Sequence, residues 1–306
     1  MSSENEQIAQ MTEKINRLRQ ERQAIILVHN YQIPEVQDIA DFLGDSLELS
    51  RMAAETDAEV IVFCGVHFMA ETAKLLSPDK TVLLPDPTAG CPMADMIDAE
   101  KLRRFKAEHP GVPVVAYVNT TAETKAESDI CCTSANAVEV VASLKAEQIL
   151  FVPDCHLASW VQERTDTEVI AWQGYCPTHQ RISPDAVRKA QQQYPDAATI
   201  VHPEAPKEIR DMADEVLSTG GMVRFSNQSQ ADEIIVGTEY GMAYRLQKEN
   251  PDKTFLTIPA AVCPNMKKTT LPKVAQALEK MEPQIQIPAD IADRARNAVE
   301  RMLEVR

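Results

Sequence analysis

Glycine is scarce in this sequence, with nine among 306 residues. None of the nine belongs to a G-x-G-x-x-G or a G-x-x-x-x-G-K motif. The sequence therefore lacks both the dinucleotide-binding fingerprint and the P-loop, whose glycines let the backbone approach a phosphate closely. A phosphate or carboxylate ligand has to be held by other groups.

Three further absences narrow the class of protein. No apolar run approaches the roughly 20 residues of a membrane-spanning helix, and the start Met1-Ser-Ser-Glu-Asn-Glu lacks the basic and apolar regions of a signal peptide. Basic residues number 31 against 46 acidic ones, and the net charge of −15 speaks against the basic face that nucleic acids require. We expect a cytoplasmic protein of two or three domains that binds neither membranes nor nucleic acid.

Short apolar, β-branched segments alternate with segments of helical periodicity. We predict strands at 24–28, 60–63, 81–84, 114–118, 148–152, 168–171 and 253–257. Near-continuous apolar strands between helices are typical of parallel sheets that helices cover on both faces. The fold class is therefore predicted to be α/β.

Cysteine is followed by proline three times, at Cys91, Cys176 and Cys263, with spacings of 85 and 87 residues. Each pair follows a predicted short strand, and other positions recur in the same phase. Fixed spacing of this kind indicates an internal repeat. The recurring polar positions are, in chain order, His29, Asn119 and His202 at strand ends, and Ser46, Ser134 and Thr219 at predicted helix starts.

We interpret the chain as three copies of a βαβα unit. The predicted domains are residues 1–110, 111–195 and 196–306, three homologous three-layer αβα domains with short parallel sheets around a pseudo-threefold axis. Residues 95–108 and 183–194 are predicted linking helices, 282–288 a proline-rich connector, and 1–22 and 288–306 amphipathic terminal helices without a role in the chemistry.

Such packing would bring the repeated side chains together, because ligands of open α/β sheets bind outside the carboxyl ends of the strands. Three distant cysteines without a C-x₂₋₄-C pair do not fit a structural zinc site. They favour an iron–sulfur cluster, in which three thiolates leave one iron open as a Lewis acid. The alternative is that the cysteines are buried structural thiols and the hydroxyls cap helices.

The other polar residues and cysteines fall into two groups, candidates for catalysis and residues expected to be structural. Glu204 and Tyr31 could move protons in a water-excluded pocket, and His179 is a candidate for catalysis or for support of Cys176. The remaining residues are expected to be structural: buried apolar thiols at Cys64, Cys131, Cys132 and Cys155, capping or packing at His67 and His156, and a surface turn at His109.

Taken together, these positions resemble the quinolinate synthase family of NAD biosynthesis over nearly the whole chain. The resemblance rests on the segments Val28-His29-Asn30-Tyr31, Gly44-Asp45-Ser46, Gly90-Cys91, Tyr117-Val118-Asn119-Thr120, Thr133-Ser134-Ala135-Asn136, Trp172-Gln-Gly-Tyr-Cys176, His202-Pro203-Glu204, Ser218-Thr219-Gly220 and Cys263. Two features depart from the family pattern. Cys263 stands alone where many relatives carry C-x-x-C-x-x-C, and Pro-Thr rather than an apolar pair separates Cys176 from His179.

The resemblance implies a 4Fe–4S cluster on Cys91, Cys176 and Cys263, one cysteine from each domain. It implies the condensation of iminosuccinate with dihydroxyacetone phosphate to quinolinate, phosphate and two waters, with a functional link to an L-aspartate oxidase or dehydrogenase. The implied substrate-binding residues are His29, Ser46, Tyr117, Asn119, Ser134, His202, Glu204 and Thr219. Tyr31 and Glu204 match positions associated with proton transfer, and we add His179 as a catalytic candidate.

Two other functions stay open at this point. A two-thiol racemase would use Cys91 and Cys176 as acid and base, but it predicts two repeats and leaves the third Cys-Pro block unexplained. An iron–sulfur sensor would need a module that binds DNA or a partner, and this acidic chain shows none. The colour and iron content of anaerobically purified protein would separate the racemase from the two cluster proteins.

Overall fold

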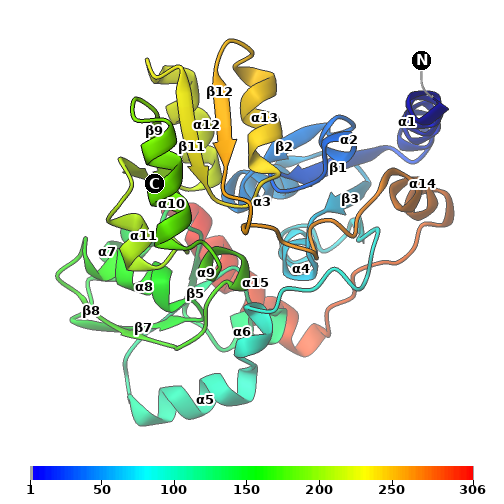
Figure 1. Ribbon diagram of the computed structural model, residues 1–306. Coiled ribbons are helices and arrows are strands. Elements are labelled where there is room, and N and C mark those ends of the chain that lie inside the picture. The colour runs from blue at the N-terminus through cyan, green and yellow to red at the C-terminus, as the bar shows by residue number, and fades with distance from the viewer. Residues whose placement is uncertain (1–2, 306) are drawn as a thin grey trace.

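The computed structural model describes residues 3–305; Met1, Ser2 and Arg306, which the predicted terminal helices include, lie outside the described residues. Three parallel four-stranded sheets share one strand order, in which the first strand of a unit pairs with the second on one side and with the third on the other. Helices flank each sheet (Figure 1). The predicted α/β class with three αβα domains is confirmed.

The first sheet has the order β2-β1-β3-β4 and is rich in fully buried β-branched residues. Its strands are β1 (Ala24–His29), β2 (Phe42–Gly44), β3 (Val60–Cys64) and β4 (Thr81–Leu83), and its helices are α2 (Pro34–Gln37), α3 (Ser46–Glu55) and α4 (His67–Leu76). The strand predicted at 81–84 ends one residue earlier than expected. Helices bury both faces of the first sheet, which explains the near-continuous apolar sequence of its strands.

The second and third sheets repeat the arrangement as β6-β5-β7-β8 and β10-β9-β11-β12. The second domain contains β5 (Val114–Tyr117), β6 (Ile130–Cys132), β7 (Gln148–Val152) and β8 (Glu168–Ala171), with α6 (Ala122–Ala126), α7 (Ala137–Leu144) and α8 (Cys155–Gln162). The third contains β9 (Ala198–Val201), β10 (Glu215–Val216), β11 (Glu233–Gly237) and β12 (Thr254–Thr257), with α11 (Lys207–Arg210), α12 (Thr219–Gln228) and α13 (Met242–Glu249).

An aspartate fixes the start of each unit in the same way. Asp41 accepts a hydrogen bond from the backbone N–H of Ile26, 15 residues earlier, at 2.8 Å. In the same way Asp129 accepts the N–H of Val114 and Asp214 accepts the N–H of Thr199, each at 2.7 Å and each from 15 residues earlier. The side chain thereby holds the first strand of the unit against the turn that enters the second.

The linking segments include helices η1 (Ala94–Met96), α5 (Ala99–Glu108), α9 (Pro177–Gln180) and α10 (Pro184–Gln193). The linking helix predicted at 95–108 is therefore interrupted. Asp98 causes the break, because its side chain accepts a hydrogen bond from the N–H of Lys101 and starts a new helix at Ala99. The helix predicted at 183–194 corresponds to α10.

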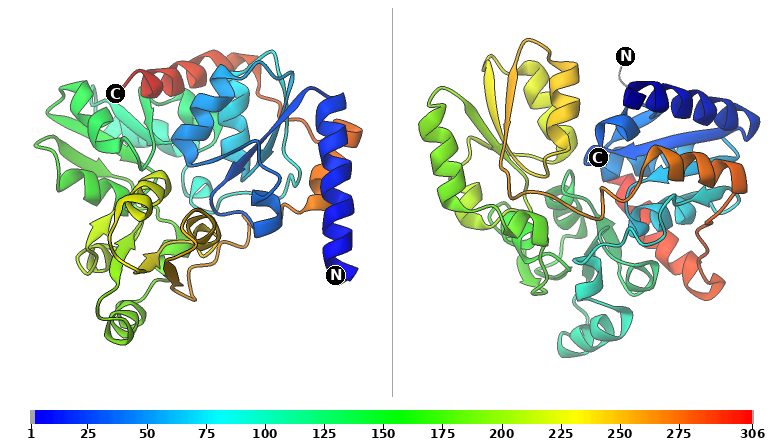
Figure 2. Two further views of the ribbon diagram at one scale, coloured as in Figure 1. Left: turned by 90° about the horizontal axis from the view of Figure 1, so that it is seen from above. Right: turned by 45° about the vertical axis from the view of Figure 1, so that its right-hand side comes forward.

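The end of the chain returns to the first two domains. Helix α14 (Leu271–Lys280) lies beside α1 (Ser3–Glu21), and α15 (Ala289–Glu304) packs on α4, α6 and β6, so it joins the first domain to the second (Figures 1 and 2). The connector between them pairs with β4 through Leu83 and Gln284. The sequence range 196–306 thus extends beyond the third domain in space. None of the helices within residues 3–305 is both long and apolar enough to cross a bilayer.

Lys125 is a fully buried lysine at the boundary of the first two domains. Its Nζ donates hydrogen bonds to the carbonyls of Val118, at 2.8 Å, and of Thr120. Glu71 of the first domain lies nearby and accepts the N–H of Ala122 at 3.1 Å. The amino group of Lys125 therefore fixes the turn after β5, the turn that carries Asn119.

We predict that Lys125→Met lowers the free energy of unfolding by about 2 kcal/mol, since two buried carbonyls lose their hydrogen-bond donor. Urea unfolding of anaerobically purified protein measures the change. Lys189→Met, at an exposed position of α10, is the matched control and should stay within about 0.5 kcal/mol of the wild type. Unchanged stability of Lys125→Met would contradict this account of the turn.

Candidate active site

One cavity lies where the carboxyl ends of the three sheets meet, and it measures about 890 Å³ when its open mouth is counted. Its lining contains every residue that the sequence put forward for ligand, cluster or proton chemistry. These are His29, Tyr31, Ser46, Cys91, Tyr117, Asn119, Ser134, Cys176, His179, His202, Glu204, Thr219 and Cys263. The predicted convergence of the three repeats therefore occurs in the structure.

The three Cys-Pro cysteines enter this central cavity from equivalent turns. Cys91 follows β4, Cys263 follows β12, and Cys176 caps the short helix α9, in which Pro177 is the first residue. All three cysteines are free, are of intermediate burial and line the cavity. Proline after each cysteine fixes the backbone next to the thiol.

Burial raises the pKa of all three thiols, that of Cys91 to about 12. Backbone N–H groups two or three residues further on oppose this effect in each turn: those of Met93 and Ala94 for Cys91, of His179 for Cys176, and of Asn265 and Met266 for Cys263. N–H groups directed at sulfur stabilise thiolate ligands and tune iron–sulfur clusters. This donor set suits a metal centre held by three thiolates.

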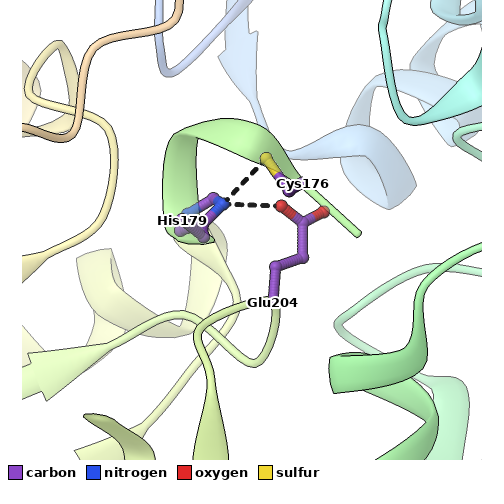
Figure 3. Close-up of side chains that lie close together, drawn as sticks. All are labelled: Cys176, His179 and Glu204. Atoms are coloured by element: carbon purple, nitrogen blue, oxygen red, sulfur yellow. Dashed lines mark hydrogen bonds and ion pairs between the residues drawn. The ribbon is translucent and has the colours of Figure 1, made fainter. Parts of the chain in front are cut away.

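Cys176 also belongs to a second group of possible ligands. Its Sγ, a ring nitrogen of His179 and a carboxylate oxygen of Glu204 all lie within 4.8 Å of one another, and Figure 3 shows the three side chains pointing toward one another. The Nδ1 of His179 is 2.7 Å from Glu204 Oε2 and 3.2 Å from the sulfur. His179 therefore connects the thiol to the carboxylate.

Glu204 is a buried carboxylate of the third domain that accepts hydrogen bonds from side chains of the second domain. The Tyr117 hydroxyl donates to its Oε1 at 2.6 Å, and His179 approaches its Oε2. Burial alone would raise the pKa of Glu204, but His179, His202 and the Tyr117 hydroxyl outweigh it and hold the pKa below its usual range. Glu204 is therefore an ionised acceptor surrounded by buried polar side chains.

His29 and His202 occupy matching positions and have matching geometry. In each case Nδ1 accepts the backbone N–H two residues on, of Tyr31 at 3.2 Å and of Glu204 at 3.3 Å. Burial lowers the pKa of both imidazoles to about 3, so both are neutral at neutral pH. With Nδ1 used as an acceptor, Nε2 carries the hydrogen.

Thr238 links Tyr31 to His179 deep in the cavity wall. Its fully buried Oγ1 is 2.5 Å from the Tyr31 hydroxyl and 2.8 Å from Nε2 of His179. Nδ1 of the same imidazole lies 2.7 Å from Oε2 of Glu204. A chain of hydrogen bonds thus connects Tyr31 with Glu204 through Thr238 and His179.

The repeated hydroxyls do not cap helices. Ser46 and Thr219 are the first residues of α3 and α12, and the caps are the residues before them, Asp45 and Ser218. The capping alternative for these two hydroxyls is therefore wrong. Ser134 lies in the turn before α7, where its Oγ is 3.1 Å from Nε2 of His202.

Three other expectations need correction. Cys64, Cys131 and Cys132 are fully buried as predicted, but Cys155 is partly exposed because it starts α8 beyond its cap, Asp154. His156 neither caps nor packs in a core; its Nε2 bonds Gln180 at 2.7 Å in an exposed position. His67 begins α4 without capping it through its side chain.

The sequence interpretation missed Glu239, Thr238 and Arg181. Glu239 is fully buried, accepts the N–H of Cys263 at 3.1 Å and pairs with Lys267 at 3.0 Å, so it holds the third cysteine turn. Thr238 and Glu239 follow β11 at the repeat position of Gly65-Val66 and Asp154-Cys155, which could have indicated them. Arg181, an exposed residue that lines the cavity, follows α9 five residues after Cys176, the same spacing that separates Lys268 from Cys263.

Comparison with known proteins agrees with this site. A family profile described as quinolinate synthetase A protein matches residues 13–304. The chain is 60% identical over 296 residues to a quinolinate synthase of Dehalococcoides mccartyi strain CBDB1, covering 96% of this chain and 98% of that protein. It is 54% identical to the quinolinate synthases of Thermodesulfovibrio yellowstonii, with 95% and 97% covered, and of Methanoregula boonei, with 96% and 98% covered. A match of this length and identity, with the repeated residues gathered in one cavity, makes the chain a member of the quinolinate synthetase A protein family.

Proposed function

We propose that this protein is a quinolinate synthase of NAD biosynthesis. It would condense iminosuccinate with dihydroxyacetone phosphate to give quinolinate, phosphate and two waters. Atoms balance in this reaction without an oxidant or a reductant. The observation that carries the proposal is the cavity itself, because side chains from all three domains that match the family motifs line it together.

Cys91, Cys176 and Cys263 would hold a 4Fe–4S cluster, one thiolate from each domain. When bound, such a cluster supplies an iron with an open coordination position, a Lewis acid that assists the loss of hydroxide from carbon. Glu239 would fix the third of these cysteines through its hydrogen bond to the backbone N–H of Cys263. His179 would lie beside the second.

The substrates would be bound mainly by neutral donors. Both are anions, and the cavity offers them the hydroxyls of Ser46, Ser134 and Thr219 together with the Nε2–H group of His29, while His202 lines the cavity with its Nε2–H directed at Ser134. Asn119 adds an acceptor, since its Oδ1 is buried without a partner among the described residues. An acceptor left without a partner suits a ligand that carries an N–H or O–H group.

Proton transfer is assigned to Tyr31, Glu204 and His179. Burial and the nearby Glu204 charge raise the pKa of Tyr31 well above its usual value, so its hydroxyl stays protonated and can donate. Glu204 lines the cavity, is ionised and can accept a proton. The chain through Thr238 and His179 connects the two groups.

Exclusion of water would protect the imine, which hydrolyses readily in solution. The cavity floor is formed by buried side chains of all three domains, and Met69, Met93 and Met266 add apolar surface to its lining. An upstream L-aspartate oxidase or dehydrogenase would supply the imine, and we assign the enzyme to the cytoplasm.

Assay of the anaerobically purified protein with both substrates tests this function. Quinolinate and phosphate should form in equal amounts, and no product should form when either substrate is omitted. Formation of D-amino acids from L-amino acids without iron would instead support the two-thiol racemase. A brown protein that binds a cluster but turns over neither substrate would support the sensor.

We predict that Cys91→Ala, Cys176→Ala or Cys263→Ala each removes the bound cluster and quinolinate formation, because each deletes one of three thiolates. Iron and sulfide analysis, the visible absorption band and activity measure the result. Cys155→Ala, outside the cavity lining, is the control and should keep both. Full iron and sulfide content in one of the three variants would refute the assignment of that ligand.

We predict that Glu204→Gln keeps the cluster but lowers kcat at least about 100-fold, since an amide cannot take up the proton. Initial rates and iron content together measure this. Glu147→Gln, at an exposed position before β7, is the control for the same chemical change. A kcat within threefold of the wild type would exclude Glu204 as the base.

A further inference from the structure

Asn30 is a fully buried amide that no step of the proposed reaction uses. It lies in the turn after β1, between His29 and Tyr31, and its side chain crosses to the third domain. Its Nδ2 is 2.8 Å from Oγ1 of Thr219, and its Oδ1 is 2.6 Å from Nη1 of Arg245. The amide therefore joins a cavity hydroxyl to an arginine of α13.

Arg245 determines which way the amide points. A guanidinium group has donors and no acceptor, so only the amide oxygen can face it. The Arg245 side chain is 15% exposed and is itself held by Leu43, whose carbonyl accepts from Nη1 at 2.9 Å, and by Glu249, which accepts from Nε at 2.7 Å. The NH₂ group of Asn30 consequently faces Thr219.

This orientation decides the role of the Thr219 hydroxyl. Its oxygen accepts a hydrogen from Asn30, so its own hydrogen must point elsewhere. Thr219 lines the cavity, and Ser218, not Thr219, caps α12. The free direction of the hydroxyl therefore leads into the cavity, where the hydrogen can be given to a ligand oxygen.

Ser134 shows the same arrangement in the second domain. Nε2 of His202 carries a hydrogen, because Nδ1 accepts the N–H of Glu204, and it lies 3.1 Å from Oγ of Ser134. This hydroxyl also accepts from a buried N–H group and keeps its own hydrogen for the cavity. Two of the three repeated hydroxyls are thus set as donors by a neighbour from another domain.

We propose that Asn30, oriented by Arg245, is a positioning residue that makes the Thr219 hydroxyl a hydrogen-bond donor to a carboxylate of the ligand. The inference rests on the proposed function, from which it takes a dicarboxylate as the ligand. Asn30 belongs to the first domain, and Thr219 and Arg245 belong to the third. The Thr219 hydroxyl is therefore held as a donor only while these two domains are in contact.

Asn30→Asp tests this proposal with almost no change of shape. The carboxylate keeps an acceptor for Arg245, but its second oxygen has no hydrogen, so Thr219 has to donate toward it and loses its donor for the ligand. Calorimetry of the anaerobic holoenzyme with quinolinate should show at least tenfold weaker binding, equivalent to about 1.4 kcal/mol. The cluster content should not change, and Asn297→Asp, at an exposed position of α15, should bind as the wild type does.

A double-mutant cycle separates hydrogen-bond direction from added charge. In the Thr219→Val background the Asn30→Asp change should weaken quinolinate binding less than threefold. Equal losses in both backgrounds would mean that only the new charge matters and would overturn the inference. Normal binding by Thr219→Val would overturn it as well.

Arg245→Met provides a second test that does not place a charge in the cavity wall. Without the guanidinium the amide can turn its oxygen toward Thr219, so binding should weaken about threefold in the wild-type background and not in Thr219→Val. Unchanged binding by Arg245→Met would overturn the role of the arginine. If the wild-type holoenzyme binds no quinolinate, the proposed function fails together with this inference. If it binds quinolinate but the binding losses of the single variants simply add in the double variants, the inference alone is wrong.

Discussion

Parallel strands end on the same edge of a sheet, and this constraint shapes the whole molecule. Each unit places the residues after its strands on one edge, and three copies of the unit turn that edge toward a common centre. No single domain assembles the cavity, because each contributes one Cys-Pro cysteine, one hydroxyl and one strand-end polar side chain. Each repeat in the sequence therefore supplies both one αβα unit and an equivalent part of the cavity lining.

Around the cavity, groups that can only donate hydrogen bonds determine the orientation of groups that can both donate and accept them. The Arg245 guanidinium orients Asn30, and the backbone N–H groups of Tyr31 and Glu204 fix the tautomers of His29 and His202. Hydroxyl groups then present hydrogen atoms to the cavity. Such a network takes the place of the glycine-rich loop that the sequence lacks, and its cost is the burial of polar groups that include the largely buried guanidinium of Arg245.

The sequence allowed the fold class and the repeated residues of the cavity lining to be predicted, because the Cys-Pro pairs recur at a spacing that the other repeated positions share. It did not predict the break at Asp98, since a single side-chain hydrogen bond decides where that helix starts. Thr238 and Glu239 were missed because they repeat a position whose residues differ in type between domains. Asn30 stood within a recognised motif, but its partners, Thr219 and Arg245, lie 189 and 215 residues away, and only the packing of domains reveals them.

Helix α15 has a consequence for how the first two domains reach their native state. Ala295, Ala298, Val299 and Met302 are fully buried where α15 packs on α4, α6 and β6, all of which lie much earlier in the chain. The ribosome therefore completes the strands of those two domains before it adds α15, and their apolar face stays uncovered in the meantime. Nascent chains pass through a stage in which that face can associate with other molecules.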